Sequence, residues 1–143
     1  MNNYMGEWYD IVGYPEKSYV LRKLTIGENG SIIIDVNPKM NEVRHSVLVD
    51  KQIHINQYVG NVEIDKFFTI NINTYEGIES SKYIVKYINK DDFLIIENEI
   101  GSELRILYRL PYLTVEKIHY IYKLCKRVNL DFDLLQINKS LVY

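Results

Sequence analysis

Short runs of alternating apolar and polar residues follow one another along the chain from Trp8 to Leu110. Turn-forming residues separate the runs at positions 27–30, 37–38, 60–61, 75–77 and 89–92, a pattern that predicts strands joined by hairpins. We expect strands near residues 8–14, 18–27, 31–37, 42–50, 52–59, 62–74, 82–89, 92–99 and 103–110, with the fourth and fifth separate or joined as one bent strand. No helical pattern longer than one turn interrupts them, so the sheet should be antiparallel, in a barrel or a sandwich.

A different pattern begins at Thr114, a residue type that caps helix N-termini. Apolar residues then recur at helical spacing, at Ile118, Ile121, Tyr122, Cys125 and Val128. The spacing predicts one amphipathic helix over about residues 114–128 that packs on the strands. The other side of this helix carries basic residues that we interpret as a solvated face, namely Lys117, Lys123, Lys126 and Arg127. We expect a short last strand over about residues 134–138.

Length and composition restrict the class of protein. A chain of 143 residues with 47% hydrophobic and 25% charged residues fits one globular domain spanning residues 1–143. The net charge is −2, which does not favour binding to nucleic acid. Charges interrupt every apolar run, so we expect no integral membrane contact. These features do not predict an oligomeric state.

The cysteine count and the first residues bear on the cellular compartment. A single cysteine, Cys125, cannot form a disulfide within the chain. Residues 1–4 have neither the basic nor the apolar part of a signal peptide. We therefore expect the protein in the cytoplasm.

Three stretches carry a resemblance to a known family. The first is Gly6-Glu7-Trp8-Tyr9-Asp10-Ile11, with Pro15 shortly after it. The second runs from Tyr83-Ile84-Val85 to Asp92-Phe93, and the third is Arg105-Ile106-Leu107-Tyr108-Arg109-Leu110-Pro111. In this order they resemble the Gly-x-Trp-Tyr motif, the strand-turn-strand motif and the last barrel strand of the lipocalins. The resemblance covers nearly the whole chain and implies an all-β, eight-stranded antiparallel up-and-down barrel with one C-terminal α-helix outside it and room for one small ligand.

The resemblance also implies how one end of the barrel is closed. In lipocalins a tryptophan fills the closed end and an arginine lies across it, which would be Trp8, next to Gly6, and Arg109. A guanidinium can stack on an indole face, so we expect a structural role for these residues rather than a ligand site. Secreted lipocalins have a signal peptide and usually a disulfide, so transport through extracellular fluid is not expected here.

The inward-facing arginine of the family sets the alternation of side chains along its strand. Counting back from Arg109 places Leu107, Arg105 and Glu103 inward. Counting from the family motif at Phe93 places Ile95 and Glu97 inward on the neighbouring strand, and Arg22, Leu24 and Ile26 are expected inward on the second strand.

Three hypotheses account for the charges expected inside. Arg105, with Arg22, could bind a ligand carboxylate or phosphate. Glu97 could instead pair with Arg105 and merely fill the barrel. A bulge could also shift the register and turn all three charges to solvent.

Two further sets of side chains each share one face of a strand. These are Tyr83, Val85 and Tyr87, and Ile32, Ile34 and Val36. Both sets fit the apolar wall of a ligand pocket, and both fit a filled core. The candidate ligand-binding residues are therefore Arg105, Glu97, Arg22, Leu24, Ile34, Val36, Tyr83, Val85 and Tyr87.

Catalytic and metal-binding patterns are not found in the sequence. Cys125 lies late in the predicted helix on its apolar face, so we interpret it as a packed, inert thiol. The three histidines, His45, His54 and His119, lie on separate predicted elements, which does not favour a metal site. Haem ligation by His45 or His54 is less favoured than a surface position. We expect no enzyme activity, no metal and no cofactor.

The expected function is binding, sequestration or transport of one small hydrophobic or amphipathic molecule. The ligand would be similar to a fatty acid or lipid, with an anionic head group on the first of the three hypotheses above. The alternative is a ligand-free, filled barrel that acts as a protein-interaction or structural module.

Overall fold

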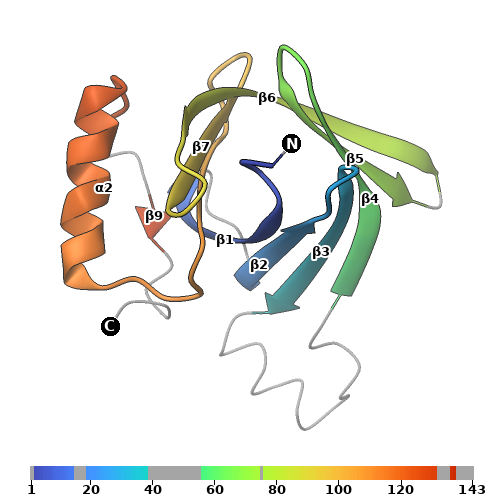
Figure 1. Ribbon diagram of the computed structural model, residues 1–143, viewed down its shortest axis with the longest axis horizontal. Helices are drawn as coiled ribbons and strands as arrows, with labels where there is room; N and C mark the ends of the chain where they lie inside the picture. Colours follow the sequence, from blue (N-terminus) through green and yellow to red (C-terminus); the bar gives the residue numbers. More distant parts are fainter. Residues whose placement is uncertain (1, 15–18, 39–55, 75, 132–135, 138–143) are drawn as a thin grey trace, which may run out of the picture.

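Eight antiparallel strands close into a barrel in the computed structural model of the chain (Figure 1). They are β1 (Gly6–Tyr14), β2 (Tyr19–Ile26), β3 (Ser31–Pro38), β4 (Asn56–Ile64), β5 (Phe68–Thr74), β6 (Gly77–Ile88), β7 (Phe93–Asn98) and β8 (Leu104–Tyr108). Strand β1 pairs with both β2 and β8, which closes the sheet. The predicted up-and-down barrel is confirmed. The structure describes residues 2–14, 19–38, 56–74, 76–131 and 136–137.

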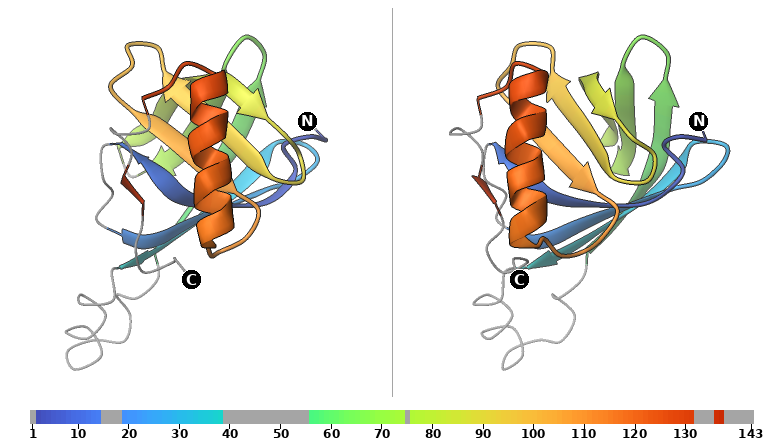
Figure 2. Two further views of the ribbon diagram at one scale, coloured as in Figure 1. Left: turned by 90° about the vertical axis from the view of Figure 1, so that its left-hand side faces the viewer. Right: turned by 60° about the vertical axis from the view of Figure 1, so that its left-hand side comes forward.

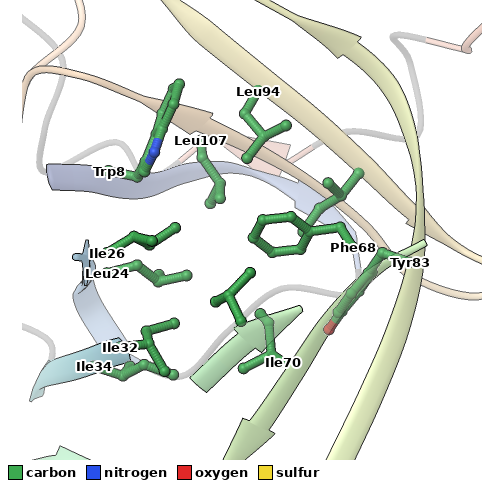
Figure 3. Packing of buried hydrophobic residues seen from close by; sticks show 12 residues of the cluster. Trp8, Leu24, Ile26, Ile32, Ile34, Phe68, Ile70, Tyr83, Leu94 and Leu107 are labelled. Atoms are coloured by element: carbon green, nitrogen blue, oxygen red, sulfur yellow. The ribbon is translucent and has the colours of Figure 1, made fainter. Parts of the chain in front are cut away.

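The sheet buries apolar side chains on both of its faces. One set points into the barrel and comes from all eight strands (Figure 3): Trp8, Leu24, Ile26, Ile32, Ile34, Val62, Phe68, Ile70, Tyr83, Leu94, Ile96 and Leu107. A second set lies outside, between the sheet and the C-terminal helix, and includes Phe93, Ile95 and Ile106. The two sets alternate along β7 and β8, as side chains of a pleated strand do.

The helix α2 (Val115–Arg127) packs on the outside of the barrel (Figure 2). Thr114 caps it, since its hydroxyl accepts a hydrogen bond of 3.2 Å from the Lys117 backbone N–H. Ile121, Leu124 and Cys125 are buried against the second set of apolar side chains. Both the predicted helix and its cap residue are therefore present.

Two side chains of the helix do not lie where the sequence pattern predicts. Tyr122 was expected on the buried face, but it is 40% exposed, and the Lys126 ammonium lies 4.5 Å from its ring centroid. Lys117 was expected in solvent, but its Nζ lies 3.3 Å from Asp92 Oδ1 and 5.4 Å from the ring centroid of Tyr120. The buried stripe is centred on Ile121 and Leu124, which leaves Tyr122 at its edge.

The strand boundaries differ from prediction in the middle of the barrel. The expected single strand 62–74 is the end of β4 and all of β5, joined by residues 65–67. The expected turn at Gly60 lies inside β4, where a Cβ on Gly60 would collide with the backbone carbonyl of Asn71 on β5. This glycine permits a close approach of two strands and does not mark a turn. Pro38 still pairs with Tyr19, so the turn expected at 37–38 is also wrong. The strand expected at 42–50 lies outside the described residues, as does the start of the one expected at 52–59.

A two-residue strand, β9 (Gln136–Ile137), pairs with β1 after the helix. It lies within the range of 134–138 expected for a last strand. Residues 134, 135 and 138 are outside the described part of the chain.

One end of the barrel is closed by Trp8 and Arg109. Trp8 is fully buried, and its indole N–H donates a 2.7 Å hydrogen bond to the carbonyl of Tyr4. The Arg109 Cζ lies 3.5 Å from the centroid of the Trp8 ring. Arg109 also donates to backbone carbonyls of Glu7 at 2.9 Å and Lys90 at 2.6 Å. The contact implied by the sequence motifs is present, and it ties β1, the β6–β7 turn and the end of β8 together.

Gly6 is required at this end for two reasons. Its φ is 108°, a conformation that side-chain-bearing residues rarely adopt. A Cβ at this position would also lie 3.0 Å from Arg109 Nη1. The first glycine of the Gly-x-Trp motif therefore makes room for the arginine.

We predict that Gly6→Ala destabilises the protein more than Gly77→Ala does. Gly77 has a similar φ of 127°, but a Cβ there would have no described atom within 4 Å apart from its chain neighbours, so it controls for backbone strain alone. Strain should cost about 1–3 kcal/mol in both variants, and displacement of Arg109 should add about 1 kcal/mol in Gly6→Ala. Urea unfolding of the two variants measures the difference, and equal losses would show that the Arg109 contact contributes nothing.

The position of the helix gives a second prediction. Ile121→Ala removes a fully buried side chain and should lower the free energy of unfolding by about 2–5 kcal/mol. Lys123→Ala, on the exposed side, should change it by less than about 0.5 kcal/mol. Similar losses in the two variants, measured by urea unfolding, would contradict this orientation of the helix.

Candidate functional site

The inner wall of the barrel is apolar over most of its surface. The predicted lining residues Leu24, Ile34 and Tyr83 belong to the buried inner set, and Val85 packs against it. In Figure 3 the side chains of Leu24, Ile34 and Tyr83 converge from strands that lie on opposite sides of the barrel. This arrangement suits an apolar molecule, because each strand contributes hydrocarbon surface and few polar groups.

Two inward-facing side chains are exposed at the end of the barrel where β6 begins. Tyr58 pairs with Ile34 and Ser81 pairs with Ile70, so both face the same side of the sheet as these inner residues. Tyr58 is nevertheless 41% exposed, and Ser81 is exposed as well. Trp8, at the other end, is fully buried. Solvent therefore reaches inward-facing side chains at one end, opposite the tryptophan.

A buried ion pair lies on the inner side of β1 and β8. The Arg105 Nε donates a 2.9 Å hydrogen bond to Asp10 Oδ1, and the two side chains are 7% and 2% exposed. A Cβ on Gly13 would lie 2.7 Å from Arg105 Cζ, so the guanidinium lies directly over the bare backbone of Gly13. The inward direction predicted for Arg105 is confirmed. Asp10 was not predicted, although strand alternation from Trp8 would have placed it inward.

A second polar contact lies nearer the open end. The Tyr83 hydroxyl donates a 3.1 Å hydrogen bond to Glu103 Oε1. Glu103 directly precedes β8, and side-chain alternation places it on the same side of the sheet as Arg105 and Leu107. From the open end towards the closed end, the inner side chains along this strand are thus those of Glu103, Arg105 and Leu107.

The prediction that Glu97 faces inward is wrong. Leu94 and Ile96 are the inner residues of β7, and Glu97 lies on the outer side, 3.5 Å from Lys86 Nζ. The error came from counting inward from Phe93, whose ring stacks outside the barrel on Tyr108 with centroids 4.6 Å apart. The partner of Arg105 is consequently Asp10 and not Glu97.

Tyr87 is also not an inner residue. The pairing of β6 with β7 shifts register between Val85 and Tyr87, so an extra residue is accommodated there. After this bulge Tyr87 packs with the outer set, beneath the helix. The hydrogen bond between the hydroxyls of Tyr120 and Tyr87 favours the protonated form of Tyr120 and raises its pKa. Tyr87 therefore helps to attach the helix rather than to line the barrel.

Two of the candidate residues are described only by their backbone. Arg22 pairs with Asp10 on one side and with Val36 on the other. The side chains of Arg22 and Val36 lie outside the described part of the structure.

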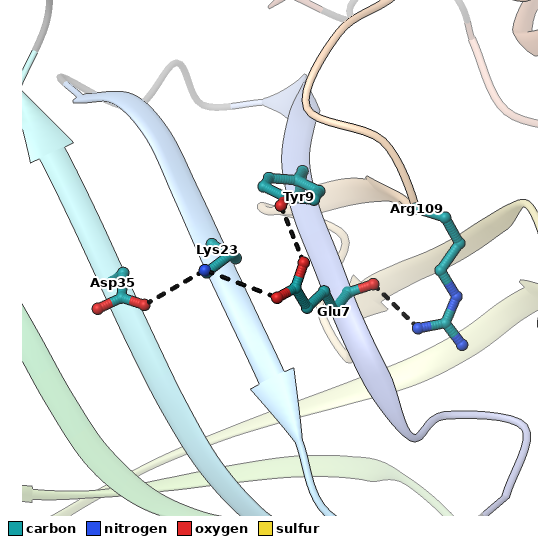
Figure 4. A network of polar contacts seen from close by, with 5 residues as sticks. All are labelled: Glu7, Tyr9, Lys23, Asp35 and Arg109. Carbon is teal, nitrogen blue, oxygen red and sulfur yellow. Dashed lines mark hydrogen bonds and ion pairs between the residues drawn. The ribbon is translucent and has the colours of Figure 1, made fainter.

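The outer side of β1, β2 and β3 carries a row of polar contacts (Figure 4). Lys23 Nζ lies 3.8 Å from Glu7 Oε1 and 4.0 Å from Asp35 Oδ2. The Tyr9 hydroxyl donates a 3.0 Å hydrogen bond to Glu7 Oε2. Such partly exposed pairs contribute little to stability. They indicate that this side of the barrel faces water.

The one cysteine, Cys125, does not have the environment of a catalytic nucleophile. Burial raises the pKa of the Cys125 thiol to about 11, so the thiol is protonated at neutral pH. His119 is exposed on the helix, and His45 and His54 are outside the described ranges. Within those ranges, no three side chains gather as metal ligands, and no helix has the length and hydropathy needed to cross a bilayer.

The inner ion pair gives a prediction about stability. Arg105→Gln leaves the Asp10 carboxylate buried without its guanidinium partner and should cost about 3–5 kcal/mol of unfolding free energy. Lys86→Gln removes the corresponding partner of Glu97 on the outer side, where the pair is partly exposed, and should cost less than about 1 kcal/mol. Urea unfolding distinguishes the two, and a loss below about 1 kcal/mol for Arg105→Gln would contradict the burial of the pair.

No protein-family model matches the chain, and no curated protein matches it. Solved structures match it in fold. The allergen Per a 4 from cockroaches is 17% identical, with a TM-score of 0.60 and coverage of 96% of this chain and 85% of that chain. The amine-binding protein of Rhodnius prolixus, in its tryptamine complex, is 10% identical, with a TM-score of 0.60 and coverage of 98% and 80%. A variant of LTBP1 in complex with leukotriene C4 is 12% identical, with a TM-score of 0.60 and coverage of 95% and 83%.

These matches span nearly the whole chain but at low sequence identity. They establish the fold and nothing finer. The chain has the lipocalin fold, as the three sequence motifs indicated.

Proposed function

We propose that the barrel binds one small hydrophobic or amphipathic molecule and thereby sequesters or carries it. The observation that carries this proposal is the apolar inner wall, contributed by all eight strands, together with the exposure of the inward-facing Tyr58 and Ser81 at the end opposite Trp8. A molecule entering there would exchange water for hydrocarbon contacts, which is the main favourable term in binding apolar ligands.

The comparisons support a binding role over catalysis. Two similar structures hold small organic molecules, tryptamine in the amine-binding protein and leukotriene C4 in LTBP1. The proposed ligand of this chain is similarly small and is lipid-like in its apolar part. The proposed setting is the cytoplasm, in keeping with a single, buried cysteine that forms no disulfide within the chain.

The anionic head group expected from the sequence needs an arginine that a ligand carboxylate can approach. Arg105 instead bonds to Asp10. The geometry of the described residues therefore supports the apolar part of the proposed ligand and not a negative charge on it.

The matched variants Ser81→Trp and Ser80→Trp test this proposal. Ser81 faces the barrel interior near its open end, and Ser80 is its neighbour on the outer side of the same strand. Both are exposed, so both variants should fold, which circular dichroism verifies. We expect the parent to bind the uncharged dye Nile red with enhanced fluorescence, and Ser81→Trp to bind it at least about tenfold more weakly.

Ser80→Trp should bind the dye like the parent. If all three proteins bind equally, the dye is held outside the barrel. If none binds, the alternative of a filled, ligand-free barrel is favoured.

A further inference from the structure

The charged side chains described inside the barrel already have polar partners. Asp10 and Arg105 are joined at 2.9 Å with almost no exposure, and Glu103 accepts a hydrogen bond from Tyr83. Among the side chains that the structure describes, this inner surface therefore combines two carboxylates with one guanidinium, which bonds to Asp10.

The position of Arg105 is fixed on the wall of the barrel. Gly13 has no side chain, and the guanidinium occupies the space where a Cβ would stand, with Nε directed at Asp10. Any bulkier residue at Gly13 would also collide with the carbonyl of Leu104. Arg105 is thus held beside β1, next to its own counter-ion.

A ligand carboxylate would meet unfavourable electrostatics at this place. To reach Arg105 it would lose its hydration and come close to the Asp10 carboxylate, and like charges in a poorly hydrated site disfavour the charged form. A hydroxyl carries no charge, and it can donate to a carboxylate and accept from a guanidinium at the same time. An alcohol can therefore approach the pair without a second ion being buried.

On the basis of the proposed function, we propose that the barrel selects a ligand with an uncharged hydroxyl group over the matching carboxylate, and that Asp10 is the residue that determines this preference. Asp10 acts by neutralising Arg105, which would otherwise attract an anion. Removal of the Asp10 charge should then redirect the barrel towards acids.

The test is calorimetric titration of the full chain with octan-1-ol, octanoate and octylamine at neutral pH. These share one apolar chain and differ only in the head group. We expect the parent to bind octan-1-ol at least about tenfold more tightly than octanoate. In Asp10→Asn, octanoate affinity should rise by about tenfold or more while octan-1-ol affinity changes by less than about threefold.

Glu97→Gln is the matched control, because it removes a carboxylate from the outer side of the barrel. It should leave the ratio of alcohol to acid affinity unchanged. Glu103→Gln provides a second test if Asp10→Asn does not fold, and it should shift the ratio towards the acid, since it also removes an inner negative charge.

Each outcome decides the question. Equal binding of octan-1-ol and octanoate by the parent overturns the inference but leaves the proposed function in place. Tighter binding of octylamine than of octan-1-ol also overturns it, since the site would then recognise a cation. If none of the three ligands binds and Nile red does not bind either, the proposed function itself fails, and the inference fails with it.

Discussion

The contact between Arg109 and Trp8 joins parts of the chain that are far apart in sequence. Arg109 lies just after β8, stacks on a side chain of β1 and donates to the carbonyls of Glu7 and Lys90. Because the first and last barrel strands and the β6–β7 turn meet there, one arginine and one buried tryptophan seal this end of the barrel. The opposite end has no comparable seal among the described residues, and inward-facing side chains there are exposed.

The two apolar surfaces of the sheet have different roles. The outer one attaches the helix through Phe93, Tyr108 and Tyr120, whose rings stack, while Lys117 bonds to Asp92 beside them. The helix covers the outer apolar surface. The inner apolar side chains are buried by one another and not by the helix. The inner surface instead combines hydrocarbon with one engaged ion pair, and this combination is the basis for the ligand that we propose.

Period-two alternation, turn residues and a helical pattern predicted an antiparallel sheet, in a barrel or a sandwich, followed by one helix, and the resemblance of three motifs to those of lipocalins implied the closed barrel. The sequence predicted the inner wall only in part. Trp8, Leu24, Ile34, Tyr83 and Arg105 face inward as expected, because no irregularity separates them from the motifs used for counting.

The errors at Tyr87 and Glu97 have local causes. A bulge after Val85 reverses the alternation of β6, and Phe93 points towards the helix rather than into the barrel. Neither feature can be recognised in a single sequence. A bulge inserts one residue and shifts the register without a distinct sequence pattern, and an aromatic side chain can occupy either face of a strand. The missed Asp10 is different, because alternation from Trp8 would have found it.

The most direct test of the account is an NMR measurement of where a ligand lies. With octan-1-ol added to protein labelled at its isoleucine and leucine methyl groups, we expect intermolecular nuclear Overhauser effects to the inner methyl groups of Ile96 and Leu107. The neighbouring residues Ile95 and Ile106, on the outer side of the same strands, should show none. Contacts to Ile95 and Ile106 but not to Ile96 and Leu107 would contradict the claim that the barrel interior is the binding site.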